Sequence, residues 1–307
     1  MKKLFTFSCI FLFCIPLISF AQKMTADEII EKTIERYNEG MEEIQNRKVV
    51  TDNGVIYERW KRNDDQRTYN MRSETESGGQ KQVAIYDGEY YYFKDPSTGK
   101  VKKKEFQASP KKLYLQLQEL DLDLSGEGEI EGQSCYVLKT EDASYSDLPI
   151  DPQTAENFMN YAGEKEEIRY DGTIYIDTEE FIIRKMDITV KEMPIKQMGK
   201  RDVHFEMINK DFREISNLPM AFKTVNIISV EMTKEEKRKA EKARENMKEM
   251  KEKMENMPPE QKEMIKSRME MANSIMMTGR IKNTKKIESV DVNIELDDKL
   301  FNPESLE

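Results

Sequence analysis

The stretch from Arg169 to Val190 constrains the fold more than any other part of the chain. It is typical of two β-strands joined by a polar turn over residues 177–180. In the return strand, from Phe181 onward, apolar and polar residues alternate with the period of two that a half-buried strand requires. The apolar side comprises Ile182, Met186, Ile188 and Val190, and the polar side comprises Lys185, Asp187 and Thr189. Such a hairpin predicts an antiparallel sheet with one apolar face.

Strand patterns of the same kind recur along most of the chain. The expected strands cover residues 54–61, 66–76, 81–94, 101–106, 126–140, 202–212 and 220–230. The last strand has the clearest alternation, which is typical of a half-buried strand. Its apolar positions are Val290, Val292, Ile294 and Leu296. These patterns together predict a curved antiparallel sheet as the frame of the protein.

A helix is predicted ahead of the first strand. Thr25 and Glu28 form a capping box, in which an N-cap threonine is followed by a glutamate three residues later. Apolar residues then recur at intervals of three and four and give one face of an amphipathic helix. They are Ile30, Ile34, Tyr37, Met41 and Ile44. Gly40 and the two residues before it are expected to end this helix early or kink it. A second helix is expected over residues 111–122, and residues 147–163 are expected to cover one end of the sheet.

The first 21 residues carry the features of a secretory signal peptide. Lysines supply a positive start, an apolar run extends to Phe20, and Ala21 provides a small residue for cleavage. A retained membrane anchor is the alternative, and the shortness of the apolar run disfavours it. Cleavage predicts a mature chain of residues 22–307, folded as one domain in the periplasm.

The composition argues against several functional classes. The chain has a net charge of -10 and becomes more negative when Lys2 and Lys3 leave with the signal peptide, which disfavours a nucleic-acid surface. His204 is the only histidine, and Cys135 is the only cysteine of the mature chain, so zinc sites built from these residue types are excluded. No nucleophile elbow, P-loop or dinucleotide-binding motif occurs. We therefore predict no enzymatic activity, no metal site and no cofactor.

The composition changes abruptly at residues 232–277, which are rich in Lys, Glu, Arg and Met. Small and apolar residues recur there at the spacing of a heptad seam. They are Ala240, Ala243, Met247, Met250, Met254 and Met257. Outer positions pair by charge, as Glu235 does with Lys239, and Pro258 and Pro259 end the first helix. We predict an inserted antiparallel helical hairpin. Its methionine seam is either its own core or an adaptable surface that binds another protein.

In their order along the chain, these segments resemble the LolA-like family of outer-membrane lipoprotein-sorting proteins, the lipoprotein carriers. The points of resemblance are the opening helix at 24–30, the hairpins at 85–92 and 176–186, and the ending at 300–303. The resemblance implies an α+β fold, an incomplete antiparallel β-barrel with covering helices and an apolar cavity for acyl chains. The inserted helical hairpin departs from the family pattern, and no arginine here is identified with the family's functional arginine.

The resemblance also implies a non-enzymatic carrier that holds lipoprotein acyl chains or other lipids and takes part in lipoprotein sorting. An inner-membrane release complex or an outer-membrane acceptor would then be its partner. The apolar faces of the expected strands supply the candidate lining. The candidates are Tyr90, Tyr92, Ile174, Ile176, Ile182, Met186, Ile188, Phe222, Val292 and Ile294. The alternative is an envelope interaction or stress-sensing module of the same fold with a packed core. Both interpretations stay open because a packed core and a cavity lining have the same sequence pattern.

Overall fold

The computed structural model describes most of the chain that follows the predicted signal peptide. The described residues are 24–63, 66–77, 80–95, 98–105, 117–144, 169–195, 199–242, 245 and 279–306. The predicted signal peptide, the predicted cover at 147–163 and most of the predicted helical hairpin lie outside these residues. Within the described part, no helix is both long enough and apolar enough to cross a membrane.

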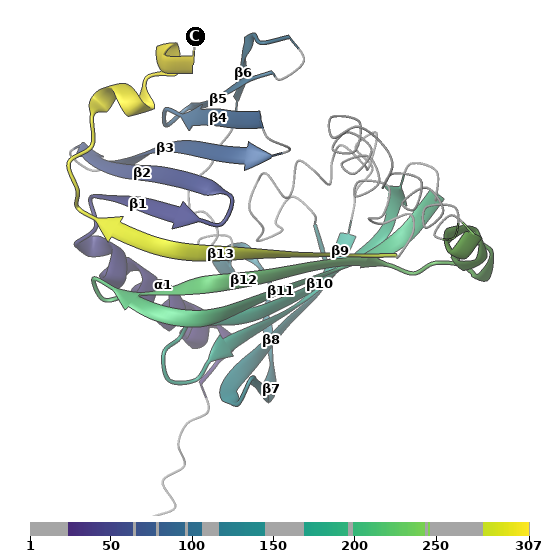
Figure 1. Ribbon diagram of the computed structural model, residues 1–307. Helices are drawn as coiled ribbons and strands as arrows, with labels where there is room; N and C mark the ends of the chain where they lie inside the picture. The colour runs from purple at the N-terminus through teal and green to yellow at the C-terminus, as the bar shows by residue number, and fades with distance from the viewer. Residues whose placement is uncertain are drawn as a thin grey trace, which may run out of the picture.

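The described strands form one 13-stranded antiparallel sheet with the order β6-β5-β4-β3-β2-β1-β13-β12-β11-β10-β9-β8-β7. Their bounds are β1 Asn46–Thr51, β2 Gly54–Asn63, β3 Gln66–Ser77, β4 Gln80–Tyr86, β5 Tyr90–Lys94, β6 Val101–Glu105, β7 Asp123–Ile130, β8 Gln133–Ser144, β9 Arg169–Asp177, β10 Ile183–Ile195, β11 Gly199–Ile215, β12 Leu218–Val230 and β13 Arg280–Val292. Neighbouring strands follow one another in sequence except at β1 and β13, which join two meanders. β6 and β7 are unpaired edges, so the sheet is curved but unclosed (Figure 1). The predicted α+β fold with an incomplete antiparallel barrel is confirmed.

Helix α1 (Ala26–Glu42) packs on one face of the sheet, which we call the inner face; the opposite face is the outer face. The Thr25 hydroxyl accepts a hydrogen bond from the Glu28 N–H at 3.3 Å, and the Glu28 carboxylate accepts one from the Thr25 N–H at 2.8 Å. The predicted capping box is therefore confirmed. Ile29 and Ile30 are buried in one cluster with side chains of β8 to β12, so the apolar stripe of α1 attaches it to the sheet.

The helix continues through Gly40 to Glu42, and the early end expected at Gly40 is wrong. Gly40 is buried against the start of β12, where a Cβ atom would lie 2.7 Å from the Cα of Leu218. Only glycine lets the two backbones approach this closely. Gly40 therefore allows close packing of helix on strand and does not break the helix.

The chain ends in two 3-10 helices, η2 (Asp298–Phe301) and η3 (Pro303–Leu306), which cover the outer face of β2 to β5. The guanidinium of Arg59 lies 4.3 Å from the ring centre of Phe301, and Arg72 donates to the Leu300 carbonyl at 3.1 Å. Phe301 and Leu306 are buried there. The two helical covers of the sheet, α1 and the C-terminal helices, thus lie on opposite faces.

The start of the predicted helical hairpin is attached to the sheet. A helix begins at residue 234 after a second capping box between Thr233 and Glu236, and the predicted ion pair between Glu235 and Lys239 is present at 2.8 Å. Ala240 is buried in the cluster beneath α1, and Glu236 forms an ion pair with Arg201 of β11 at 3.3 Å. The first turns of this segment are therefore part of the packed domain.

The hairpin of β9 and β10 has the predicted faces with one correction. The buried inner-face residues of β10 are Met186, Ile188 and Val190, and Lys185, Asp187 and Thr189 lie on the outer face. The register shifts at Arg184, so Ile183 pairs with Ile176, and Ile182 is buried in the turn before the strand. Placing Ile182 on the face of Met186 is therefore wrong, because a bulge adds a residue that simple alternation does not reveal.

Candidate functional site

The inner face of β8 to β12 is an apolar surface that helix α1 covers. Four predicted lining residues lie in its buried cluster and are at most 3% exposed: Ile174, Ile176, Met186 and Ile188. Ile29 of the helix and Tyr170 of β9 are buried in the same cluster. Leu117, Leu120 and Leu122, from the end of the second expected helix, also belong to it. This half of the inner face is a packed core.

The inner face of β2 to β5 carries aromatic side chains, which we call the aromatic row. It comprises Trp60, Tyr69, Tyr86, Tyr91 and Phe93. The ring centres of Trp60 and Tyr69 are 5.6 Å apart, and those of Tyr69 and Tyr86 are 5.9 Å apart. Trp60 also packs against Met41 and Ile44 at the end of α1, so the aromatic row continues the apolar surface beyond the helix. Trp60, Tyr91 and Phe93 are only partly buried.

A buried ion pair lies beside the aromatic row. Arg47 of β1 pairs with Glu58 of β2, and their side chains are 12% and 7% exposed. The Tyr69 hydroxyl donates to the other Glu58 oxygen at 2.7 Å, and the Arg47 guanidinium lies 5.2 Å from the Trp60 ring centre. Burial opposes both charges, yet Arg47 lowers the pKa of Glu58, and Glu58 raises the pKa of Arg47. The pair is therefore ionised within an apolar surrounding.

Tyr90 and Tyr92, which were predicted to line the cavity, lie on the outer face. Tyr92 pairs with Ile85, whereas Tyr91 pairs with Tyr86 of the aromatic row. The Lys103 ammonium lies 3.3 Å from the ring centre of Tyr90 and 5.7 Å from that of Tyr92. The sequence predicted an aromatic strand here but not its facing, because residues 90–93 are aromatic at every position.

The remaining candidates lie near the end of α1 or in turns. Phe222 is on the inner face of β12, under the Arg213 guanidinium at 4.1 Å. Val292, the last residue of β13, packs against the cluster of Met41 and Ile44. Ile294 follows Asn293, whose positive φ of 52° ends the strand earlier than the alternation predicted. The structure therefore brings Ile174, Ile176, Met186 and Ile188 together, and separates Tyr90 and Tyr92 from them.

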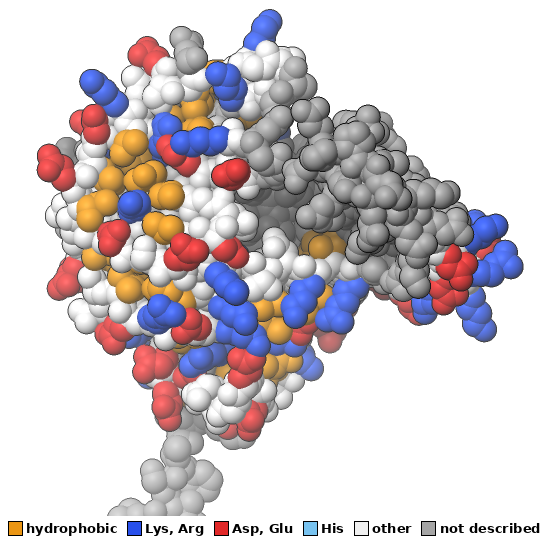
Figure 2. Space-filling model, in the orientation of Figure 1, with side chains coloured by type: hydrophobic (Ala, Val, Ile, Leu, Met, Phe, Trp, Pro, Cys, Tyr) orange, Lys and Arg blue, Asp and Glu red, His pale blue; other side chains and the backbone are white. Residues whose placement is uncertain are grey.

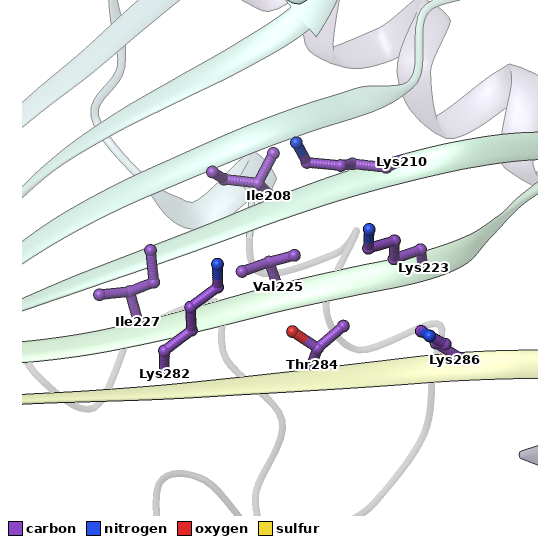
Figure 3. A pocket seen from close by; sticks show the side chains of 8 residues that line it. All are labelled: Ile208, Lys210, Lys223, Val225, Ile227, Lys282, Thr284 and Lys286. Atoms are coloured by element: carbon purple, nitrogen blue, oxygen red, sulfur yellow. The ribbon is translucent and has the colours of Figure 1, made fainter. Parts of the chain in front are cut away.

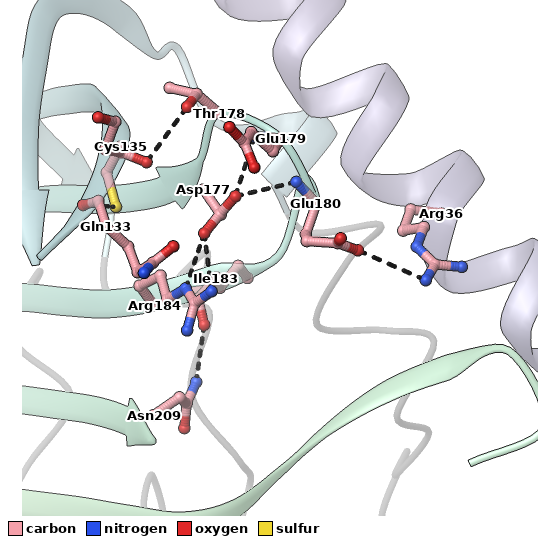
Figure 4. A network of polar contacts seen from close by, with 11 residues as sticks. Arg36, Gln133, Cys135, Asp177, Thr178, Glu179, Glu180, Ile183, Arg184 and Asn209 are labelled. Atoms are coloured by element: carbon pink, nitrogen blue, oxygen red, sulfur yellow. Dashed lines mark hydrogen bonds and ion pairs between the residues drawn. The ribbon is translucent and has the colours of Figure 1, made fainter. Parts of the chain in front are cut away.

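The turn between β9 and β10 attaches the end of the core to α1 (Figure 4). Asp177 is 3% exposed and accepts hydrogen bonds from the Glu179 and Glu180 N–H groups at 2.9 Å, and from Arg184 at 2.8 and 2.9 Å. Although burial opposes it, these donors hold the pKa of Asp177 below its usual range. Glu180 then forms an ion pair with Arg36 of α1 at 3.6 Å. This network has the geometry of a structural turn.

The described residues offer little for catalysis. Among them, no group of three or more His, Cys, Asp or Glu side chains is arranged to hold a metal ion. Cys135 is fully buried, and burial raises the pKa of its thiol, which suits a packing role. The imidazole of His204 lies within 3.2 Å of the Thr189 hydroxyl on the outer face, away from the inner-face surfaces.

The fold and the inner face define an open antiparallel β-barrel with a helix against its inner face. Similar solved structures include a DUF1329 family protein from Desulfovibrio piger, with 9% identity and a TM-score of 0.45 over 91% of this chain and 98% of that one. A LolA superfamily protein from Nitrosomonas europaea has 10% identity and a TM-score of 0.39 over the same shares. The lipoprotein LppX of Mycobacterium tuberculosis has 11% identity and a TM-score of 0.24 over 53% of this chain and 87% of its own.

No protein-family model matches the chain, and no curated protein does. The similar structures include a member of the LolA superfamily, the family that the sequence resembles. These likenesses concern the fold and do not identify a ligand.

Proposed function

We propose that the protein is a non-enzymatic carrier or binding protein for the acyl chains of lipids or lipoproteins. The observation that carries the proposal is the aromatic row, which extends the apolar inner face beyond α1. An acyl chain needs a long apolar surface with few polar groups, and aromatic rings supply such area at low entropic cost. Trp60, Tyr91 and Phe93 are partly exposed, so they keep apolar area accessible for contact.

The location and the partners are proposed from the sequence. The predicted signal peptide of residues 1–21 supports the periplasm, and the LolA-like resemblance supports a role in outer-membrane lipoprotein sorting. An inner-membrane release complex or an outer-membrane acceptor would exchange the ligand with this protein. The predicted helical hairpin at 232–277 is the segment that we propose for binding a protein partner, because its methionine seam is adaptable.

Two double variants on the same strand test the acyl-chain site. Tyr91→Gln with Phe93→Gln changes the inner face, and Tyr90→Gln with Tyr92→Gln makes a similar change on the outer face. We expect the first pair to weaken the binding of a fluorescent fatty acid about tenfold or more, since it removes two aromatic contacts of about 0.5–1.5 kcal/mol each beyond their area burial. The second pair should leave binding unchanged.

Native mass spectrometry of protein purified from its own envelope gives an independent readout, with bound lipid or lipoprotein as the expected result. A ligand-free protein that also ignores added fatty acid and lipoprotein would overturn the proposal. Equal loss of binding in both double variants would point to general unfolding, which circular dichroism would detect.

The second candidate is an envelope interaction or stress-sensing module with a packed core. The observation that favours it is the packing beneath α1, where Ile29, Ile174 and Ile176 are almost fully buried. In this case the inner face has no room for a ligand, and both double variants should change only stability. The fatty-acid titration therefore separates the two candidates.

A further inference from the structure

The outer face carries an open groove across β11, β12 and β13, with a volume of about 420 Å³ (Figure 3). None of the side chains that line it is acidic, and four are lysines. The lysines are Lys210, Lys223, Lys282 and Lys286, and aliphatic side chains, among them Ile208 and Val225, project from the same face of the sheet. Figure 2, in which β11 to β13 face the viewer, shows the basic side chains gathered around hydrophobic ones on this surface. A basic groove is unexpected in a chain whose net charge is -10.

The register of the strands places like charges side by side. Lys210 is directly opposite Lys223, and Lys223 is directly opposite Lys286, so three ammonium groups form a row across three strands. Like charges at opposed positions destabilise a sheet. Glu131 forms an ion pair with Lys210, but within the described part of the chain no carboxylate lies within ion-pair distance of Lys223, Lys282 or Lys286. The repulsion within the row would be relieved by an anion bound from outside.

The second row of the groove consists of two aliphatic residues and Thr284, which is directly opposite Val225. Ile208 is opposite Val225, and both lie two residues along their strands from the lysine row and on the same face. Rows on one face of a sheet that are two residues apart are separated by about 7 Å. Lysine stems cover apolar surface while their ammonium groups reach outward. The groove therefore combines positive charge with the lysine stems and the half-buried side chain of Ile208, over a floor of buried Val225 and Ile227. This combination matches the headgroup region of a phospholipid bilayer.

We propose that this groove docks the protein on an anionic bilayer by binding the phosphate groups of its lipids. An acidic peptide is less suitable, because β12, the central strand of the groove, is paired with β11 on one side and β13 on the other over residues 223–229, so a peptide cannot add as a strand within the groove. Docking on a bilayer surface is a separate activity from holding an acyl chain on the inner face. It therefore goes beyond the proposed function and is measured independently of it.

Vesicle flotation with the full chain tests the proposal. The chain should float with vesicles of phosphatidylcholine and phosphatidylglycerol in equal parts, and not with vesicles of phosphatidylcholine alone. The triple variant Lys223→Gln, Lys282→Gln and Lys286→Gln should bind about 100-fold more weakly, since each lysine near an anionic surface strengthens binding about fivefold. Replacing the same lysines by arginine should preserve binding, and raised salt should weaken it.

The matched control is the triple variant Lys100→Gln, Lys139→Gln and Lys237→Gln, which removes the same charge from exposed positions outside the groove. It should bind the mixed vesicles as the unchanged chain does. Absence of flotation with the mixed vesicles, or equal loss in the two triple variants with circular dichroism unchanged, would overturn the proposal. Release from the vesicles by inorganic phosphate at the concentration of lipid phosphate would also overturn it, because the groove would then be a site for soluble anions. Binding of polyglutamate without binding of vesicles would assign the groove to an acidic polypeptide instead.

Discussion

The two halves of the inner face are stabilised in different ways. On β8 to β12, helix α1 covers aliphatic side chains that are almost fully buried, and the charged groups lie at the turn between β9 and β10. On β2 to β5, the inner face is aromatic, and Glu58 forms an ion pair with Arg47 of the neighbouring β1, while the helical cover lies on the outer face. One half thus has the composition of a core, and the other is the surface on which the proposed acyl-chain binding rests.

The two halves show that aliphatic burial and burial of an ion pair among aromatic side chains occur within a single continuous sheet. An aliphatic core stabilises the fold by removing apolar surface from water, and each fully buried side chain contributes about 1.5–3 kcal/mol. A buried ion pair gains little for stability, because its desolvation cost offsets its attraction. The ion pair of Arg47 and Glu58 lies beside the aromatic row, so this half of the sheet is not optimised for stability by apolar packing alone.

The largest effect is expected from Glu58→Gln, which tests the ionised half. The change leaves the Arg47 guanidinium without a countercharge in a nearly dry site, so unfolding free energy should fall by about 3–5 kcal/mol. The double variant Arg47→Met with Glu58→Gln removes the unpaired charge and should recover most of the loss. Urea unfolding of both variants measures this. A loss of unfolding free energy below about 1 kcal/mol in the single variant would mean that water screens the charge of the Arg47 guanidinium.

The next effect is expected from Asp177→Asn, which tests the attachment of the packed half to α1. The amide cannot balance the Arg184 guanidinium, so a loss of about 2–4 kcal/mol is expected. The unchanged protein should also lose stability as the pH falls from about 4, the unfolded value for aspartate, toward the lower folded pKa of Asp177. Above pH 4 the contribution is fully present. When the midpoint of urea unfolding is measured as a function of pH between about 4 and 2, it should fall less steeply for Asp177→Asn than for the unchanged protein.

A smaller effect is expected from Gly40→Ala, which tests the close contact of α1 with β12. The added methyl group meets the Leu218 backbone, and overpacking of about 1–3 kcal/mol outweighs a helix-propensity gain of about 1 kcal/mol. Asn38→Ala, at an exposed position of the same helix, is the control and should stabilise slightly. Thermal unfolding compares the two. Stabilisation of both variants would show that the contact between Gly40 and Leu218 accepts the added methyl group without a loss of unfolding free energy.

The smallest effect concerns two deletions in the predicted helical hairpin, each bridged by a short Gly-Ser linker. Removing residues 243–277 keeps Ala240 and Glu236 and should leave the melting temperature unchanged. Removing residues 233–277 also removes the burial of Ala240 and the ion pair with Arg201, at a cost of about 1–2 kcal/mol. A large loss in the shorter deletion would mean that the predicted hairpin is part of the core. Loss of fatty-acid or partner binding without a change in stability would show that the predicted helical hairpin is needed for binding.

Local patterns in the sequence predicted local structure well. The capping box at Thr25, the alternation of Met186 and Ile188, and the pair of Glu235 and Lys239 all depend on residues a few positions apart. Features that depend on distant neighbours were missed or misread. Gly40 was expected to interrupt the helix, because nothing near it in sequence announces Leu218.

The candidate site was predicted less completely for the same reason. Residues 90–93 are aromatic throughout, so their facing is determined only by pairing with β4. Trp60, Tyr69 and Tyr86 lie on three separate strands and form a row only after the sheet has assembled. A signal that could have found them is the run of aromatic residues on successive short strands, counted by face once a register is assumed.

The pairing of β1 with β13 has a consequence for the order in which the protein folds. Arg47 pairs with Val292 and Val49 with Val290, so this junction joins opposite ends of the described chain, whereas every other pair joins strands that are consecutive in sequence. Local hairpins close quickly, and pairing between distant segments is slow because of its loop-closure entropy. Each meander can therefore form on its own, but β1 keeps an open edge until the last strand has emerged. If the predicted signal peptide of residues 1–21 directs export, the β1 edge has to be protected for nearly the whole passage across the membrane.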